Sequence, residues 1–544
     1  MNDEAYMQDP FQIQRVRRWQ WSAVAFALVL YSWSLAPTTF WLDSAQLQVR
    51  ALEAFQWSPD ARQYPLYIFM ARLLTLALSP VNAAWGLNAL TAAFGCLAVY
   101  WLFELLTRLR ISAPAALAGC VAYTVAHTVW YVSVITEVYT LFALLLFGML
   151  AAVVRWSRER PQSLYGAAFL LGLGMGHHRL MWLALAPLGL YVWLRRAELT
   201  PGVRRRSFGV FLVGLLPLAS WAAYYLWSGH TVGEFFNAYF FSGIPNWRTV
   251  MQDVSPTKFG KSALLFALFF VYNFVGAALI FGAAGFVSAW RRRTPETWLF
   301  VSLAAVNMAF GLDYNVEDQW VFFLPVYAVF VVWVAQGADA WLRRLQAREK
   351  PFRRWAVPVM LVVLAATPIL TYAVTPRILA DTNVLPAKRA NAEAYYRMLF
   401  NPSRRGDRAA YEFARRVFDE VPRNSVLLCD AASYSVLRYF QQSENVGHTI
   451  WLGFLDSTDA DYLRSVIAEH ESSHEVYLVL NPFHPWSSQA DFERVGKGVG
   501  SDLSLYKADP TTGAKALIMT RRQSVAPVAA LRVRSSSCSS CSAT

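Results

Sequence analysis

The stretch that decides the fold is residues 15–44, RVRRWQWSAVAFALVLYSWSLAPTTFWLDS. It begins with a cluster of three arginines, continues through a mainly apolar run without a charge, and ends just past Asp43. A helix needs about 20 apolar residues to cross a hydrocarbon core about 30 Å thick. The stretch therefore predicts a membrane helix over residues 20–38, with basic residues at one end and a carboxylate at the other. Because no small-residue cleavage site follows the run, we expect it to be kept as an anchor.

The same pattern recurs along the chain and predicts a bundle of about eleven membrane helices. The predicted spans lie near residues 20–38, 84–106, 113–132, 138–154, 162–176, 179–194, 208–227, 263–289, 297–312, 320–341 and 355–374. The composition agrees, because only 16% of the residues are charged, whereas a soluble protein carries about 25%. The sequence thus predicts a mainly α membrane protein.

Basic residues fall on one side of the predicted bundle. With the N-terminus inside, the inner segments up to residue 354 contain 22 arginines and lysines and the outer segments contain seven. Positively charged loops stay on the cytoplasmic side of a membrane. This bias predicts a multi-pass protein of the cell (inner) membrane, with a cytoplasmic N-terminus and an extracytoplasmic chain after about residue 375. The clusters also account for the net charge of +13, so we expect no nucleic-acid partner.

The composition divides the chain into four parts. We expect a cytoplasmic segment over residues 1–19, a transmembrane domain over 20–375, an extracytoplasmic α/β domain over 376–522, and a disordered tail over 523–544. Two long outer loops are expected, at residues 39–83 and 228–262. In the C-terminal part the pattern predicts helices over 407–420 and 431–441, strands over 425–430 and 475–480, and a hairpin formed by 503–506 and 516–520.

Nearly every charged or histidine residue within the apolar regions falls at the outer end of a predicted span. A charge at the membrane is costly unless it faces a hydrated cavity or a partner, so such residues are candidates for function. The candidate catalytic residues are Asp43 and Glu137, and the candidate substrate-binding residues are Tyr64, His177, His178, Arg179, Asp313 and Asp318. Together they predict an outward-facing cavity with several carboxylates and a cationic rim.

Each candidate also has a simpler structural explanation. Asp43 could cap a helix that lies in the interface, Glu137 could be a first-turn carboxylate stabilised by the helix dipole, and the two histidines could be ordinary interfacial residues. The alternating glycines Gly172, Gly174 and Gly176 indicate close helix packing rather than a phosphate loop. We identify no metal ligands that converge, although a divalent metal is a possible cofactor.

Such a cavity suits the transfer of a sugar. A carboxylate near the membrane surface can act as a general base on the hydroxyl group of an acceptor. A cationic rim can bind a lipid phosphate and stabilise the charge on a departing phosphate. The donor would then be a polyprenyl-phosphate sugar, whose carrier remains in the membrane lipid.

A series of short motifs resembles a known family. In chain order they are Asp43-Ser44, Tyr64-Pro65-Leu66-Tyr67, Trp85 with Asn88-Ala89-Leu90, Glu137-Val138-Tyr139, Gly176-His177-His178, Tyr314-Asn315 with Asp318, and Phe323-Leu324-Pro325 with Tyr327. Their order and spacing, over about residues 20–340, resemble bacterial relatives of the transmembrane O-mannosyltransferases that act on plexin-type receptors. That group is a branch of the GT-C glycosyltransferase superfamily.

The resemblance implies a GT-C-like bundle in which Asp43 is the catalytic base. The chain departs from the family at two places. Asp43-Ser44-Ala45-Gln46 stands where the family has Asp-Ser-Gly-Glu, so a second carboxylate is missing. Trp57-Ser58-Pro59-Asp60 replaces a His-Pro-Pro-Gly stretch.

The leading hypothesis is a membrane glycosyltransferase that moves a sugar from a polyprenyl-phosphate carrier to an extracytoplasmic protein or glycan acceptor. Asp43 would be the base, Glu137 and Asp318 would orient the acceptor or the sugar, and Arg179 with His177 or His178 would hold the phosphate. One alternative is a transporter of lipid-linked sugars, which would show charges near mid-membrane and often an inverted repeat. The other is a non-catalytic scaffold, which would keep its function when the carboxylates are neutralised.

Overall fold

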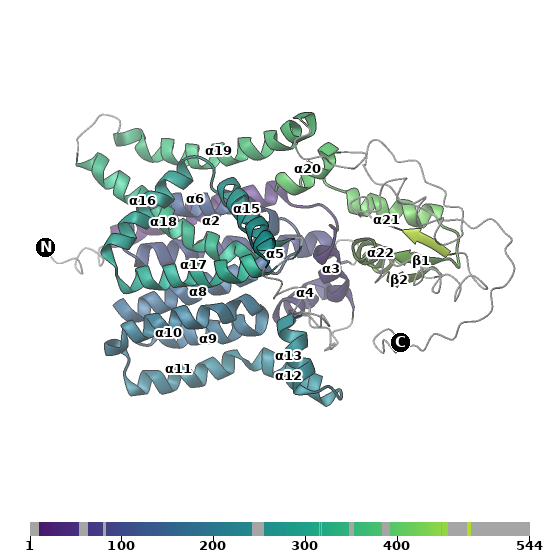
Figure 1. Cartoon of the computed structure of the whole chain (residues 1–544), viewed down its shortest axis with the longest axis horizontal. Coiled ribbons are helices and arrows are strands. Elements are labelled where there is room, and N and C mark those ends of the chain that lie inside the picture. The colour runs from purple at the N-terminus through teal and green to yellow at the C-terminus, as the bar shows by residue number, and fades with distance from the viewer. Residues whose placement is uncertain are drawn as a thin grey trace.

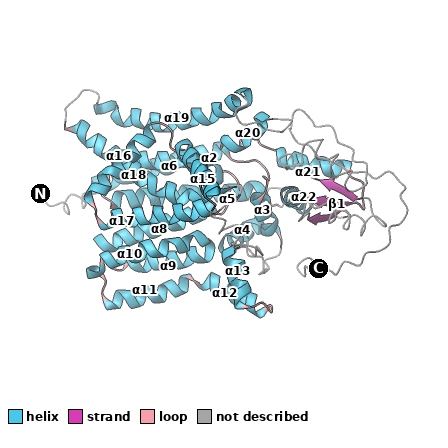
Figure 2. Ribbon diagram, viewed as in Figure 1, coloured by secondary structure: helices cyan, strands magenta, loops and turns pink. Residues whose placement is uncertain are grey.

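The computed structural model describes residues 10–53, 64–79, 83–241, 255–314, 316, 318–347, 353–382, 392–447, 449–454 and 476–479. The predicted tail, the predicted hairpin of 503–506 and 516–520, and parts of both long outer loops lie outside the described residues, as do Asn315, Glu317 and the stretch Trp57-Ser58-Pro59-Asp60. The described chain is mainly helical, with a small α/β unit beyond one end of a helical bundle (Figures 1 and 2).

Helices form at all the predicted spans. They are α2 (Pro10–Ser34), α5 (Ala83–Arg108), α6 (Ala113–Val125), α7 (His127–Ser133), α8 (Tyr139–Arg158), α9 (Ser163–His177), η2 (Arg179–Ala184), α10 (Leu185–Leu194), α11 (Pro201–Gly214), α12 (Leu216–Trp227), α15 (Pro256–Asn273), α16 (Ala277–Arg292), α17 (Pro295–Asp313), η4 (Gln319–Phe323), α18 (Leu324–Gln346) and α19 (Arg353–Thr382). The mainly α prediction is therefore confirmed.

Four of the described helical segments are long and apolar enough to cross a membrane, and three further bent pairs would bring the number to seven. Three predicted spans are wrong as single helices, because the structure bends 113–132 by 68° between α6 and α7, 208–227 by 50° between α11 and α12, and 263–289 by 109° between α15 and α16. Gly276 lies at the break between α15 and α16, with φ 76° and ψ −127°. A residue with a side chain would be strained in this backbone conformation, whereas glycine adopts it readily. The predicted total of about eleven spans stays a prediction.

The arginine-rich ends of the helices gather at one end of the bundle (Figure 1). There the buried Glu296 carboxylate at the start of α17 pairs with Arg158 at 3.1 Å and with Arg195 at 2.9 Å. Arg108 pairs with Glu159 at 2.6 Å. These ion pairs join the ends of four helices that are far apart in the sequence. The opposite end of the bundle faces the α/β unit.

Small residues let helices approach closely in the absence of a hydrophobic driving force between them. A Cβ atom added to Gly285 of α16 would lie 1.8 Å from the backbone oxygen of Trp333 in α18. One added to Gly172 of α9 would lie 2.5 Å from the backbone oxygen of Phe211 in α11. The predicted role of the glycines before the histidine pair, as close-packing residues, is confirmed for Gly172.

The C-terminal unit contains a parallel three-stranded sheet in the order β2-β1-β3. Its elements are α20 (Ala392–Phe400), α21 (Ala409–Glu420), β1 (Val426–Cys429), α22 (Ala431–Glu444), β2 (Trp451–Phe454) and β3 (Val476–Val479). The predicted helices and the two predicted strands are confirmed, with shifts of a few residues at their ends. β2 was not predicted, because four residues including Gly453 give too short a pattern to recognise.

The core of the C-terminal unit is completed by residues from the first outer loop. Helices α21 and α22 and strands β1 and β3 pack with five buried residues from elsewhere in the chain, which are Ala36, Phe40, Trp41, Ala45 and Ile135. The Trp41 ring lies 5.2 Å from the ring of Phe413 in α21. The unit is therefore joined to the bundle by a shared hydrophobic core.

Candidate functional site

The predicted site residues lie in the links between helices at the end of the bundle that faces the C-terminal unit (Figure 1). Asp43 begins α3 (Asp43–Leu52), and Tyr64 directly precedes α4 (Pro65–Ala77). Glu137 lies between α7 and α8, and the His177–Arg179 turn joins α9 to η2. Asp313 ends α17, and Asp318 directly precedes η4.

Asp43 is exposed and follows a residue with an unusual backbone conformation. The N-cap of α3 is Leu42, with φ 55° and ψ −130°, and its side chain makes no capping hydrogen bond. The alternative that Asp43 caps the helix is therefore wrong. A backbone conformation in this sparsely populated φ/ψ region destabilises the folded state by about 1–3 kcal/mol when the residue has a side chain. Residues in such conformations cluster at active sites. The contacts on both sides of Leu42 must hold it there.

Glu137 is half-buried, and its backbone N–H donates to Oγ1 of Thr91 at 3.4 Å. Because α8 begins only at Tyr139, Glu137 precedes the helix, and the alternative of a first-turn carboxylate is wrong. Burial raises the pKa of Glu137 well above its usual value, and the nearby carboxylates of Asp43 and Asp318 raise the same pKa further. Three predicted carboxylates therefore share one region.

A buried polar network fixes the helix of Asp43 against the link that carries Glu137. The Gln48 side chain of α3 donates to Oγ1 of Thr136 at 2.8 Å and to Oδ1 of Asn88 at 3.4 Å. Thr136 in turn donates to the same Asn88 oxygen at 2.6 Å. None of these three residues was predicted to have a role, although Asn88 lies in one of the motifs that carry the resemblance. Polar residues within apolar stretches were the signal that could have pointed to them.

The two histidines hold the α9–η2 turn together. Nε2 of His177 is 3.1 Å from the backbone oxygen of Val138, next to Glu137. Nδ1 of His178 accepts a hydrogen bond from the backbone of Leu180, and its ring stacks on Tyr64 with centroids 5.5 Å apart. Both side chains are at most 2% exposed, so the alternative of ordinary interfacial histidines is wrong.

Arg179 is half-buried among aromatic residues. Its guanidinium donates to the Tyr314 hydroxyl at 3.0 Å and to the backbone oxygen of Phe240, in α13 (Val232–Phe241), at 3.3 Å. Its Cζ atom also lies 5.4 Å from the centre of the Tyr314 ring. Burial raises the pKa of Tyr64, whereas the positive charge of Arg179 acts in the opposite direction. Arg179 is thus a held cation near the Tyr64 phenol, on which the charges of Asp43 and Glu137 also act.

The described residues contain no group of three or more His, Cys, Asp or Glu side chains arranged to hold a metal ion. The carboxylates influence one another electrostatically but do not form a coordination shell in this part of the chain.

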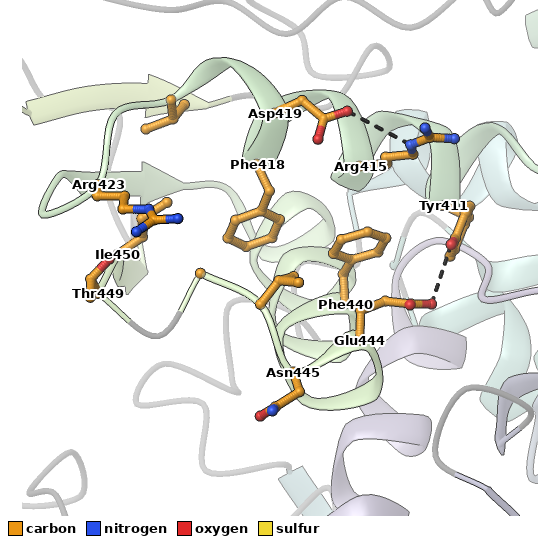
Figure 3. A pocket seen from close by; sticks show the side chains of 13 residues that line it. Tyr411, Arg415, Phe418, Asp419, Arg423, Phe440, Glu444, Asn445, Thr449 and Ile450 are labelled. Atoms are coloured by element: carbon orange, nitrogen blue, oxygen red, sulfur yellow. Dashed lines mark hydrogen bonds and ion pairs between the residues drawn. The ribbon is translucent and has the colours of Figure 1, made fainter.

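A pocket of about 560 Å³ lies in the C-terminal unit, between α21, α22 and the turn after α22 (Figure 3). Phe418 and Phe440 stack within it at 5.6 Å, Arg415 pairs with Asp419, and Tyr411 donates to Glu444. None of the predicted site residues lines this pocket. The carboxylate cluster and the pocket are separate features.

Replacement of Glu137 by glutamine is expected to stabilise the fold at neutral pH while reducing activity. With a raised pKa, folded Glu137 keeps a proton that the unfolded chain loses, so its contribution to stability is full below the usual pKa and is lost as pH rises toward the folded pKa. Glutamine cannot ionise and removes this loss. The measurement is the difference in thermal stability between about pH 5 and about pH 8, for the unaltered protein and for the variant, each purified in detergent. An unchanged pH dependence in the variant would contradict the assignment.

Comparisons with known proteins identify a matching family and relatives of similar sequence. Residues 63–200 match the family described as the N-terminal domain of the protein O-mannosyl-transferase TMEM260. The mouse (Mus musculus) protein O-mannosyl-transferase TMEM260 is 24% identical over 435 residues, which cover 74% of this chain and 58% of that protein. The chain therefore spans less than two thirds of the length of this curated relative. The matched range includes Glu137 and the His177–Arg179 turn but not Asp43.

Two solved structures have a similar fold. ArnT from Cupriavidus metallidurans, bound to undecaprenyl phosphate, has a TM-score of 0.55 at 13% identity, over 92% of this chain and 97% of that chain. The oligosaccharyltransferase AglB from Archaeoglobus fulgidus, in complex with an inhibitory peptide and a dolichol-phosphate, has a TM-score of 0.51 at 13% identity, over 92% of this chain and 74% of that chain. The predicted GT-C-like fold and the predicted resemblance are confirmed.

Proposed function

We propose that this protein is a GT-C-type membrane glycosyltransferase that moves a sugar from a polyprenyl-phosphate carrier to a hydroxyl group of a protein or glycan. The observation that supports the proposal is that Asp43 and Asp318 lie near Glu137, and that Asp43, Glu137 and Arg179 all act on Tyr64, at one end of the bundle. General-base catalysis and phosphate binding need a carboxylate and a fixed cation near each other. The similarity to an O-mannosyl-transferase supports the same class of reaction.

In the proposed reaction, the Asp43 carboxylate accepts the proton of the acceptor hydroxyl as its oxygen attacks the anomeric carbon of the sugar. The bond between this carbon and the phosphate oxygen of the carrier breaks, and the electron pair leaves with the phosphate. Arg179 stabilises the negative charge that grows there, as a fixed cation in a partly desolvated site does effectively. Burial and the nearby carboxylates raise the pKa of Glu137, and in its protonated form Glu137 can donate a hydrogen bond to the acceptor or the sugar, as can Tyr64.

The carrier is proposed on chemical grounds and by similarity. Undecaprenyl phosphate and dolichol-phosphate, named with the two similar structures, are both polyprenyl phosphates. Arg179 contacts Tyr314 and the backbone of Phe240, whose ring packs against Trp182, and these aromatic residues suit the boundary between a phosphate and its apolar chain. We assign Arg179 to the phosphate, Asp318 and Asp313 to the sugar, and His177 and His178 to the support of Tyr64 and the Glu137 link.

The orientation is part of the proposal. The arginine-rich end of the bundle would face the cytoplasm of a cell membrane, and the site and the C-terminal unit would face the opposite side. Because a lipid carrier brings the sugar through the membrane, the site needs no nucleotide-bound donor outside the cell. Several helices are bent or broken, as in transporters. The carboxylates, however, lie in links at helix ends rather than at these breaks, which favours an enzyme.

The test is direct transfer by the purified protein in liposomes that contain polyprenyl-phosphate hexoses. We expect release of polyprenyl phosphate together with a hexose on an acceptor peptide or glycan, detected by mass spectrometry. Extracytoplasmic glycoproteins and glycolipids of a deletion strain, compared with the parent strain, identify the natural acceptor. Absence of transfer with every carrier sugar, together with an unchanged glycan profile in the deletion strain, would refute the proposal.

A further inference from the structure

Arg404 lies in the segment between α20 and α21, and its side chain is only 1% exposed. Its Cζ atom lies 5.0 Å from the ring centre of Phe40 and 4.7 Å from that of Tyr131. Phe40 belongs to the first outer loop and Tyr131 to α7. A planar guanidinium between two aromatic rings is held by the attraction of its charge to the ring faces. Arg404 therefore connects three separate segments of the chain.

Further contacts fix the segment that carries Arg404. Its backbone N–H donates to the backbone oxygen of Ser34, the last residue of α2, at 2.9 Å. Its Nη2 donates to the backbone oxygen of Met398 at 2.5 Å, and Asp407 lies 4.0 Å from Nη1. The buried charge thus has both a carboxylate and a carbonyl partner. The segment is attached at the point where the chain leaves the first membrane helix and enters the loop toward Asp43.

The loop that carries Asp43 is held from both sides. On the bundle side, the Asn88 side chain donates to the backbone oxygens of Ala36 and Thr38, each at 3.0 Å. On the other side, Phe40 contacts Arg404 and Trp41 packs against Phe413. Directly after these contacts comes Leu42, whose φ of 55° is sustained only if its surroundings hold it.

We propose that the C-terminal unit positions the catalytic base, and that Arg404 is the positioning residue through which it does so. Arg404 fixes Phe40, Phe40 and Trp41 fix the conformation of Leu42, and Leu42 directs Asp43 toward Glu137 and Asp318. Arg404 touches neither donor nor acceptor in this scheme. The claim that Asp43 is the positioned base rests on the proposed function. The claim that Arg404 fixes the conformation of the loop before Asp43 does not depend on it. It assigns to the C-terminal unit a role in the chemical step that does not require it to bind substrate.

The first test measures transfer by Arg404→Met, which keeps an unbranched, largely apolar side chain but removes the charge and the planar group. We expect kcat to fall about 10²-fold, the usual result of misplacing a catalytic group by about 1 Å, with an unchanged KM for the polyprenyl-phosphate sugar. Arg404→Lys keeps the charge without the planar stacking and should give an intermediate kcat. The matched control is Arg405→Met, since Arg405 is exposed and stacks on the exposed Trp33. It should behave as the unaltered protein.

The second test measures geometry without activity. A spin label is attached to Leu42→Cys, an exposed position, in a full-length protein whose Cys538 and Cys541 are changed to Ser. The other cysteines, Cys96, Cys120 and Cys429, are buried. Arg404→Met should make this label more mobile, and Arg405→Met should not. If Arg404→Met does not fold, Phe40→Leu removes one ring beneath the guanidinium and should have the same effect in a weaker form.

The outcomes are distinguishable. A label at position 42 whose mobility is insensitive to both Arg404→Met and Phe40→Leu overturns the positioning role, whatever the activity. An equal loss in kcat and in donor affinity also overturns it, because that pattern indicates general damage to the fold. If the unaltered protein transfers no sugar, the proposed function fails, and the label alone then decides whether the C-terminal unit holds the loop.

Discussion

Asp43→Asn is expected to lower sugar transfer by about 10³-fold or more, with folding and donor binding intact. General-base catalysis contributes about 10²–10⁴-fold, and asparagine cannot accept the proton of the acceptor hydroxyl. The substitution keeps the size of the side chain at an exposed position, so no packing is lost. Initial rates with a polyprenyl-phosphate sugar in liposomes give kcat and KM separately. The loss should appear in kcat, because the missing interaction is made only in the transition state.

The matched control is Asp419→Asn, which neutralises an exposed carboxylate of α21 that pairs with Arg415. Its rate should equal that of the unaltered protein, because an exposed ion pair contributes little. Full activity of Asp43→Asn would remove the proposed mechanism. It would leave the membrane scaffold as the better description, especially if Glu137→Gln and Asp318→Asn were also without effect.

Arg179→Gln is expected to lower kcat about 10²–10³-fold, the usual cost of removing one group that stabilises charge in the transition state. A smaller rise in KM for the donor should accompany it, since the guanidinium also binds the phosphate of the intact donor. Inhibition by free polyprenyl phosphate provides a second measurement, because the leaving carrier carries more charge than the donor. The inhibition constant should be higher for Arg179→Gln than for the unaltered protein, because the cation is lost. In the unaltered protein, added salt should also weaken the inhibition, because salt screens the attraction between Arg179 and the phosphate.

Arg196→Gln is the control for this variant. Arg196 is exposed and lies 5.1 Å from the ring centre of Trp193, so it offers a similar cation and ring at the arginine-rich end of the bundle. Its loss should change neither kcat nor inhibition by the carrier. If Arg179→Gln transferred sugar at the normal rate and bound polyprenyl phosphate normally, the phosphate would have to be held elsewhere.

The helices were predictable because apolar runs and arginine clusters alternate along the chain. Hydrophobic length and charge are local properties, and they locate spans without any knowledge of the neighbours. The bend between α15 and α16 was not predictable in this way. Residues 263–289 contain no charged residue, and the break depends on the backbone of Gly276, whose effect in a membrane helix varies with the packing around it.

The carboxylates could be proposed from the sequence because charges are expensive at a membrane. Their grouping could not be derived in the same way, because Asp43, Glu137 and Asp318 come from links that are far apart in the chain. The structure adds the Gln48–Asn88–Thr136 network and the aromatic residues that hold Arg179. Such contacts depend on side-chain directions that a one-dimensional pattern does not contain.

Arg404 was also absent from the sequence analysis. It lies outside every apolar run, in a segment that looks like an ordinary polar connection. Its burial follows only from the approach of Phe40 and Tyr131, which come from the other end of the chain. The C-terminal part was therefore predicted as a separate α/β domain, whereas its described core includes residues of the first outer loop.

That shared core has a consequence for biogenesis. Chains are made from the N-terminus at about 5–20 residues per second, and each part folds when its partners are available. Phe40 and Trp41 leave the ribosome long before Phe413 and the rest of α21 exist, so the loop must wait while the remaining helices are inserted. Maturation of the site would then be the last event of assembly. A chain that stopped short of α21 could enter the membrane and still never become competent.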